Sequence, residues 1–526
     1  MNIQVVIMYS RRDLLVYSLL ATSILIPFTF SIYLLSNRYM PLWTDPGEWL
    51  KYSNAIEAYI AKSLGSNEPI YSQMLYVMWG QGVWQYPPLL LLILIILKHL
   101  IGPLNSLKLT ASILFALQPL PMYYLGRELT DSRFGGLVAA YTTSLMPLYI
   151  EMFSWGGYPN LLGYILMAFS FYYLIKLFKE YRRSYLINLT ILSILIPFTH
   201  HLTFSIFVGV SSLLLLLLLI PGMYSEAKYV LASLSTSIAT FLLYRFLLAY
   251  PPEYITFNEA AYYSLRVDFL NALSWLFKSP IPFVAVLLLI IYLFVRGAYD
   301  LEPSHILFIL SWLIVPVFAT QGYLLHIAID YNRVFFFIIQ PTTLVVAAPV
   351  KSLVKSGFLK NVEGISLRRD LTPIIVVILI LTASISTLVY GYYTMWNAYG
   401  WYSSQDPYGD FEKYTALNWI RYNTGPYSVF IADEHMGRWI EGYAIRRTLI
   451  YMEPKFIYIK GQLDRHYIAS SILLGHHEFR NKYLRVFEQS PYNISFTPVI
   501  SMWSMGEYKN TLYINDTGLT LNTSRY

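Results

Sequence analysis

The chain has 526 residues, of which 56% are hydrophobic and 13% are charged, and its formal net charge is +7. Soluble globular proteins carry about 25% charged residues, so this composition excludes a water-soluble enzyme, a disordered chain and a nucleic-acid-binding domain. Cysteine is absent, which excludes disulfide bonds, iron–sulfur clusters and thiolate metal sites. The sequence therefore indicates a polytopic α-helical membrane protein with the lipid bilayer, and no nucleic acid, among its partners.

The first apolar run, Leu14 to Leu35, follows Arg11 and Arg12 and is long enough to cross a membrane. A signal peptide is the alternative, but its apolar region would be shorter, and no small-residue cleavage site precedes Asn37. Further spans are predicted at 106–125, 134–150, 160–178, 185–199, 202–221, 229–249, 280–296, 304–320, 333–350 and 371–394. The expected total is about eleven transmembrane helices.

One apolar run, Leu89 to Leu97, is too short to span and is expected to be interfacial or re-entrant. If it does not cross, the basic loops at 127–133, 176–183 and 351–369 all lie inside, as the positive-inside rule requires. We therefore predict a multi-pass plasma-membrane protein with a cytoplasmic N-terminus and an extracytoplasmic C-terminal domain. Glycosylation sequons beginning at Asn493, Asn515 and Asn522 agree with that orientation.

Two domains are expected. Residues 1–394 form the transmembrane domain, whose long first external loop, 37–105, contains an amphipathic helix from Gly47 to Lys62. Residues 395–526 are predicted to form a small α/β domain. Its first elements are a helix from Tyr408 to Tyr422 and a buried strand beginning at Val429.

Four external segments carry polar side chains next to apolar spans. They contain Asp45 and Glu48 in the first, Glu151, Trp155, Tyr158 and Asn160 in the second, His200 and His201 in the third, and His326, Asp330 and Arg333 in the fourth. Ionisable groups near membrane depth are costly, and they favour a functional explanation. The predicted orientation brings all four segments to the outer face.

Each candidate also has a structural explanation. Asp45, in a Pro-Gly turn, is either a helix cap or a general base or ligand of a hard divalent cation. The aromatic second loop is either an interfacial turn or a surface that holds a sugar ring. Adjacent helical residues point apart, so we expect one histidine of His200 and His201 to join a polar cluster rather than both to bind one ion. His326 also fits a simple interfacial position.

Arg333 begins an apolar span at its outer end. A structural arginine there would snorkel to the lipid headgroups or form a salt bridge with Asp330. A functional arginine would bind a phosphate, because the planar guanidinium grips phosphate with two hydrogen bonds and stays charged.

In order along the chain, these segments resemble the GT-C class of membrane glycosyltransferases. The resemblance rests on Thr44-Asp45, on Tyr86-Pro-Pro-Leu, on Gly126-Arg-Glu-Leu leading into Gly135-Gly-Leu-Val-Ala-Ala, on the aromatic second loop, on the histidine turn and on the late external arginine. The composition and the external sequons also favour an archaeon from a hot habitat as the source.

The C-terminal region, residues 395–526, which we call the tail, carries a second resemblance. The run from Ala416 to Thr424, then Asp433, then the run from Gly437 through Trp439 to Leu449 is similar to the segment around the acceptor-binding motif of the oligosaccharyltransferase catalytic subunit. That family has Trp-Trp-Asp-Tyr-Gly there, and this chain has neither tryptophan. The second loop also has Tyr-Pro-Asn160 where that family has Asp-x-Asp.

The resemblance implies a sugar donor linked to a polyprenyl, dolichyl-type phosphate, and an acceptor that is a glycan, a lipid or a protein. It implies Asp45 as general base, with Glu48 and Glu151 as further catalytic candidates, and Arg333 as the phosphate clamp. Either a divalent cation, Mg²⁺ or Mn²⁺, binds Asp45 and Glu151, or the transfer is independent of metal with Asp45 as base. Besides Arg333, the residues expected to bind substrate are Trp155, Tyr158, Asn160, His200, His201, His326, Asp330 and Trp439. An inactive relative that binds a glycolipid or a protein, and a transporter, are the alternatives.

Overall fold

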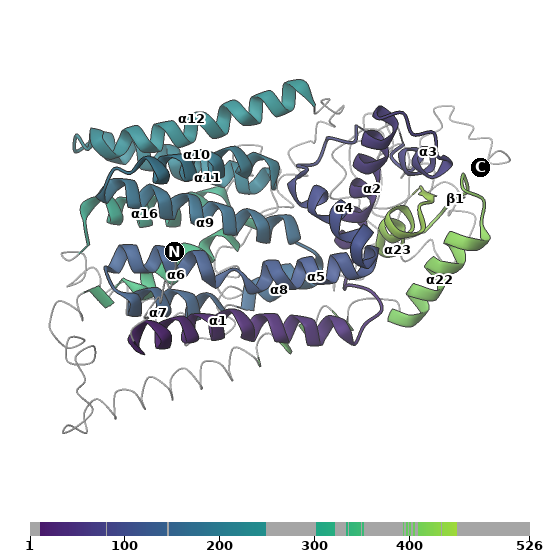
Figure 1. The fold of residues 1–526 in the computed structure, drawn as a ribbon, viewed down its shortest axis with the longest axis horizontal. Helices are drawn as coiled ribbons and strands as arrows, with labels where there is room; N and C mark the ends of the chain where they lie inside the picture. The colour runs from purple at the N-terminus through teal and green to yellow at the C-terminus, as the bar shows by residue number, and fades with distance from the viewer. Residues whose placement is uncertain are drawn as a thin grey trace, which may run out of the picture.

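The computed structural model describes residues 11–79, 82–144, 147–248, 301–320 and 409–449, most of 333–351 and a few positions between 393 and 404; position 433 is not described. These residues are almost entirely helical. One group of roughly parallel helices forms a bundle, and a second group packs over one end of it (Figure 1). The predicted spans at 280–296 and 371–394 lie almost wholly outside the described residues.

The bundle consists of α1 (Arg11–Ser36), α5 (Pro103–Ala116), α6 (Pro119–Thr130), α7 (Arg133–Ser144), α8 (Pro147–Trp155), α9 (Tyr158–Lys179), α10 (Arg183–Leu195), α11 (His201–Leu219), α12 (Tyr224–Leu247), α16 (Pro303–Ala319) and α18 (Ile339–Ala347). By length and composition, four helices among the described residues are able to cross a membrane: the 16–36 part of α1, and α9, α11 and α12. The mostly helical, apolar membrane architecture predicted from the sequence is thus present.

The predicted span 106–125 is divided into two helices in the structure, and the second of them begins at Pro119. Proline has no amide hydrogen, and its ring clashes with the preceding turn of a helix. The apolar pattern was read correctly here, but the proline interrupts the helix that the pattern predicted. The predicted span 134–150 contains α7 and α8, and residues 145 and 146 between them lie outside the described residues.

The second group, which we call the cap, contains α2 (Asp45–Ser63), α3 (Pro69–Tyr76), α4 (Leu89–Ile101), α22 (Asp410–Asn423), α23 (Glu434–Trp439) and a π-helix at Ile440–Ala444. Strands β1 (Val429–Phe430) and β2 (Arg447–Thr448) pair in parallel, with Val429 opposite Arg447. The cap therefore combines the first loop with the start of the tail (Figure 1). Residues 450–526 lie outside the described residues.

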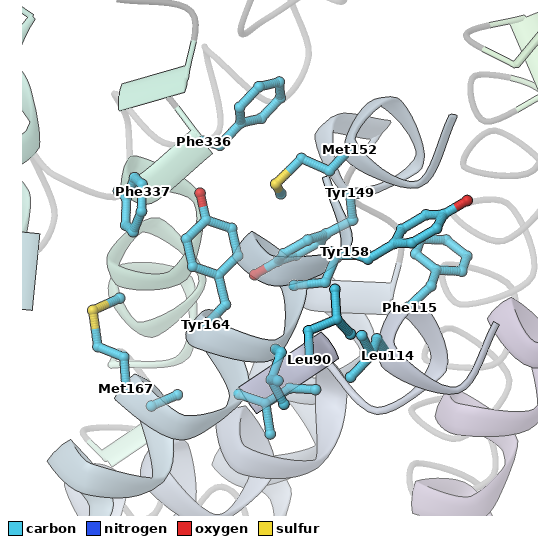
Figure 2. Packing of buried hydrophobic residues seen from close by; sticks show 14 of the residues in the cluster. Leu90, Leu114, Phe115, Tyr149, Met152, Tyr158, Tyr164, Met167, Phe336 and Phe337 are labelled. Carbon is cyan, nitrogen blue, oxygen red and sulfur yellow. The ribbon is translucent and has the colours of Figure 1, made fainter. Parts of the chain in front are cut away.

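The hydrophobic core joins the bundle to the cap. Figure 2 shows Leu90 of α4 near Leu114 and Phe115 of α5, with Tyr158 and Tyr164 of α9 beside them. All five side chains are almost completely buried. Because burial of apolar surface stabilises by about 25 cal/mol per Å², this contact fixes α4 and the ends of α5 and α9 as one packed unit.

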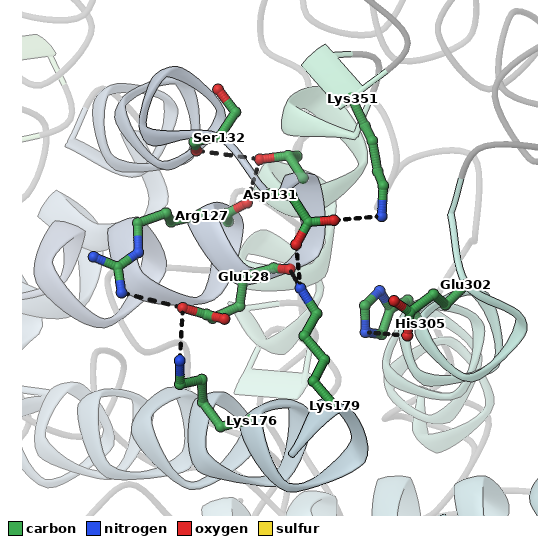
Figure 3. A network of polar contacts seen from close by, with 11 residues as sticks. Arg127, Glu128, Asp131, Ser132, Lys176, Lys179, Glu302, His305 and Lys351 are labelled. Atoms are coloured by element: carbon green, nitrogen blue, oxygen red, sulfur yellow. Dashed lines mark hydrogen bonds and ion pairs between the residues drawn. The ribbon is translucent and has the colours of Figure 1, made fainter. Parts of the chain in front are cut away.

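A polar network lies at the C-terminal end of α9, opposite the end that packs against the cap (Figure 3). Lys351 Nζ lies 2.8 Å from Asp131 Oδ2, and Lys179 pairs with the other oxygen of Asp131. Lys176 Nζ lies 3.3 Å from Glu128 Oε1. Burial raises the pKa of Asp131, but the two lysines outweigh it and hold that pKa below its ordinary value. The basic residues assigned to the cytoplasmic side thus gather at the end of the bundle remote from the cap.

We expect the two ends of the bundle to face opposite sides of the membrane. Ser184 lies near the α9–α10 turn and Asn67 lies in the cap, and both are exposed. Because the chain has no cysteine, Ser184→Cys and Asn67→Cys each introduce a single thiol. An impermeant maleimide should label Asn67→Cys in intact cells and should label Ser184→Cys only after the membrane is opened. Equal labelling of the two thiols in intact cells would contradict the predicted orientation.

Candidate functional site

Asp45 is the first residue of α2, and its side chain is buried. The N-cap is Thr44, which makes no side-chain capping bond. Asp45 instead uses Oδ1 to accept hydrogen bonds from Arg438 Nη1 and, at 3.4 Å, from Thr44 Oγ1. Among the described residues, Oδ2 of Asp45 makes no hydrogen bond. Asp45 therefore presents one oxygen to the protein and leaves the other for a ligand.

Close backbone approaches set the position of Asp45. Gly156 has φ of +93°, and a Cβ there would lie 2.5 Å from Pro46 Cδ and 2.9 Å from Asp45 Cβ. Glycine is required by both the left-handed conformation and the lack of space. Trp49 Nε1 donates to Gly156 O at 2.7 Å, which fastens the second loop to α2.

The tail also packs against the start of α2, where Asp45 lies. A Cβ on Gly47 would lie 2.8 Å from the carbonyl oxygen of Arg438, so α2 and α23 touch through their main chains. Trp439 is completely buried, and its Nε1 donates to Trp43 O at 2.7 Å. Trp43 adopts a positive φ of 66°, which is rare for a bulky residue. The tail thus supplies Arg438 to Asp45 through a tightly defined contact.

A second buried ion-pair cluster lies one turn along α2. Lys51 Nζ is 3.0 Å from Glu48 Oε1 and 3.1 Å from Glu441 Oε2. Glu441 is fully buried in the π-helix, and its Oε1 accepts hydrogen bonds from Trp79 Nε1 and from the amide and hydroxyl of Thr448, each at 3.2 Å. Glu48 therefore belongs to a network that joins α2 to the tail.

The positively charged side chain of Arg333 lies against the aromatic second external segment. Trp155 ends α8, and the guanidinium carbon of Arg333 lies 5.3 Å from the centre of its ring. A cation–π contact of this kind holds an arginine in place without consuming its hydrogen-bond donors. Trp155 also faces Phe336, at 6.4 Å between ring centres.

The turn before α11 approaches the first loop. His201 Nε2 lies 3.3 Å from Gln85 O, and the rings of His200 and His201 lie 6.2 Å and 6.0 Å from the ring of Tyr86. Tyr86 was part of the Tyr-Pro-Pro-Leu resemblance only and was not among the predicted site residues. Its ring packs on Trp49 at 4.8 Å, one turn along α2 from Asp45.

Three other predicted residues line the junction of α8 and α9. Glu151, Tyr158 and Asn160 are each at most 2% exposed. Asn160 Nδ2 has no hydrogen-bond partner among the described residues. Asp330 and His326, which were predicted to bind substrate, lie outside the described residues.

No group of three or more His, Asp or Glu side chains within the described residues has the arrangement of a metal site. Oδ1 of Asp45 faces a guanidinium. The binding of a divalent cation by Asp45 and Glu151 stays a prediction, and no chemical step is derived through one.

The sequence patterns did not predict a role for Arg438, Lys51 or Glu441, and the reason differs for each residue. Arg438 stands next to the predicted Trp439, but its partner lies 393 positions away. Lys51 sits on a helix whose apolar pattern assigns it to a solvated face, and Glu441 looks like an ordinary surface residue. The weak signal was the density of charged residues around Trp439 in the run 437–449.

No protein-family model and no curated protein matches the chain. Among solved structures, the crystal structure of ArnT from Cupriavidus metallidurans bound to undecaprenyl phosphate is similar over 88% of this chain and 88% of that one, with a TM-score of 0.49 and 11% sequence identity. A likeness of this degree leaves the function to be argued from the residues of the chain itself.

The contact between α2 and the π-helix yields a stability prediction. A Cβ on Gly442 would lie 2.0 Å from Gly47 O, so Gly442→Ala should displace the tail from α2. Overpacking of this kind costs about 1–3 kcal/mol. Thermal unfolding in detergent and protease sensitivity of residues 409–449 would measure the effect. Gly425→Ala is the matched control, since its nearest neighbour is Ser428 Oγ at 3.4 Å; equal stability of the two variants would contradict the close contact.

Proposed function

We propose that this protein transfers a sugar from a polyprenyl, dolichyl-type phosphate to a hydroxyl-bearing acceptor on the outer face of the membrane. The observation that carries the proposal is the state of Asp45, a buried carboxylate held by Arg438 through one oxygen. Its other oxygen makes no hydrogen bond to the part of the chain that the structure describes. A carboxylate so oriented suits proton removal from an acceptor group.

The proposed reaction is a single displacement. The acceptor hydroxyl oxygen forms a bond to the anomeric carbon of the sugar while the bond from that carbon to the phosphate oxygen breaks. Asp45 takes the hydroxyl proton, and the polyprenyl phosphate leaves with the electron pair. Arg333 binds the phosphate, whose negative charge increases as the bond breaks, and such stabilisation is often the largest part of catalysis.

The surroundings of Asp45 support sugar chemistry. Tyr86 packs on Trp49 of α2, and Trp155 lies under Arg333. Aromatic faces next to hydrogen-bonding groups suit a sugar, which has apolar C–H surfaces and polar hydroxyls. These groups favour transfer over transport, because Asp45 and Trp49 belong to α2 of the cap and Trp155 is the last residue of α8. The cap lies over one end of the bundle (Figure 1).

We expect Asp45→Asn to lower transfer by about 10²–10⁴-fold, the usual contribution of a general base. Donor binding should persist, because the amide nearly keeps the shape of the carboxylate. The measurement is the single-turnover rate at saturating donor, together with a thermal melt. Glu57→Gln is the control, since Glu57 is another paired carboxylate of α2, bound to Lys98 and His99. Transfer near the wild-type rate in Asp45→Asn would leave the protein as an inactive, ligand-binding relative.

We expect Arg333→Lys to weaken donor use although the charge is retained. Lysine lacks the planar fork and stacks poorly on Trp155. Loss of a charge-assisted hydrogen bond costs roughly 1.5–3 kcal/mol, about one to two decades in donor affinity. Donor-concentration dependence of transfer, measured for the Lys and Ala variants, tests this.

Arg421→Lys is the matched control for Arg333, because Arg421 also lies over aromatic rings, those of Tyr422 and Tyr443, but in the tail. Its donor affinity should stay within twofold of the wild type. If Lys at 333 behaves like Arg while Ala only lowers expression, Arg333 anchors the protein in the membrane and does not bind the phosphate.

A further inference from the structure

Tyr86 has a buried hydroxyl with no hydrogen-bond partner among the described residues. Its ring is enclosed by those of Trp49 and Tyr52, at 4.8 Å and 5.8 Å between ring centres. Its main chain is also fixed, because Tyr244 Oη donates to Tyr86 O at 3.1 Å. Buried polar atoms are nearly always paired in proteins, so a rigidly held hydroxyl without a protein partner is available to a ligand.

His200 repeats this feature on the facing segment. Its Nδ1 is buried and has no hydrogen-bond partner among the described residues. The imidazole ring lies 6.2 Å from the ring of Tyr86, between ring centres. Two unpaired polar groups, from the segment before α4 and the turn before α11, therefore lie side by side.

Both groups are electrically neutral near pH 7. Burial raises the pKa of the Tyr86 hydroxyl well above its ordinary value; the Arg333 charge opposes this, and Asp45 and Glu48 add to it. Burial lowers the pKa of His200 well below its ordinary value, and the charge of Arg333 acts in the same direction. Tyr86 thus keeps its proton to donate, and His200 is a neutral imidazole with one nitrogen that accepts and one that donates.

Trp49 connects Tyr86 to the segment on which Arg333 lies. Its ring packs on Tyr86, and its Nε1 donates to the carbonyl of Gly156, which directly follows the Trp155 ring under Arg333. The phosphate itself carries only acceptors and is served by a cation. A sugar hydroxyl both donates and accepts, so a phenol and a neutral imidazole complement it. The rings of Trp49 and Tyr52 supply apolar surface on the flank of the same group.

We propose that Tyr86 and His200 form a subsite that binds a hydroxyl group of the donor sugar, next to the phosphate held by Arg333. This assignment rests on the proposed function and deepens it. It makes Tyr86 a residue that recognises the sugar, whereas Arg333 recognises the lipid phosphate common to donor and product.

The test compares two soluble probes on the purified full-length protein in detergent. One is citronellyl phosphate, and the other is citronellyl phosphate carrying mannose, glucose or galactose. Tyr86→Phe should bind the best sugar-bearing probe roughly tenfold more weakly, the loss of one hydrogen bond to an uncharged group, and should bind citronellyl phosphate as the wild type does. Arg333→Lys should weaken both probes. Binding is followed by tryptophan fluorescence or calorimetry.

Tyr59→Phe is the control, because Tyr59 lies on α2, the helix that carries Trp49 and Tyr52, but has an exposed side chain. His200→Asn gives an independent variant, and its loss should also be confined to the sugar-bearing probe. Equal losses on both probes would assign Tyr86 to the phosphate, and no loss on either would make its hydroxyl structural; each outcome overturns the subsite. A wild-type protein that binds neither probe would overturn the proposed function itself.

Discussion

The buried ion pair between Asp45 and Arg438 is the interaction on which the site depends. Removing two charges from water costs several kcal/mol each, and only good geometry and further hydrogen bonds repay that cost. The pair joins the first loop to the tail across 393 positions of sequence. Because the two partners come from α2 and α23, these two helices form one structural unit.

Three glycines make that ion pair sterically possible. Gly47 and Gly442 let the main chains of α2 and the π-helix touch, and Gly156 lets the second loop lie against Asp45. Side chains at these positions would separate the three segments before the charged groups came within reach. Lys51 then secures the contact, because its ammonium group bridges Glu48 of α2 and Glu441 of the tail.

The sequence predicted the elements better than their contacts. Apolar runs and local patterns gave the helical membrane architecture, the helix near 408–422 and the position of the strand at Val429, since these depend on neighbouring residues. The predicted burial of that strand was wrong, because Val429 is 46% exposed. Pro119 was a sequence signal that the span 106–125 is interrupted. Arg438 and Glu441 were beyond reach, because their partners lie hundreds of positions away and no periodicity records such a pairing. Tyr86 was visible only as part of a motif, and its significance depends on what surrounds its hydroxyl.

Helix α4 shows how the same site can serve a lipid-linked substrate. Its 13 residues extend about 20 Å, too short to cross the hydrocarbon core. Leu90, Leu91 and Leu94 are buried against the bundle, whereas Leu92, Ile96 and Leu100 are exposed. Exposed apolar residues at four-residue spacing form one stripe, as in helices that lie in the membrane interface.

Hydrogen bonds connect the polar end of α4 to α2 and, through it, to the tail. Lys98 Nζ donates to Asn54 Oδ1 at 2.7 Å, and Asn54 Nδ2 donates to Gly442 O at 2.8 Å. The exposed apolar stripe of α4 is thereby held at a fixed position relative to α2 and the tail. An aliphatic chain lying along that stripe would follow α4 toward the segment that begins it, which is the segment that contains Tyr86. Under the proposed function, the apolar part of the donor would lie along α4 and its sugar would lie beside Tyr86.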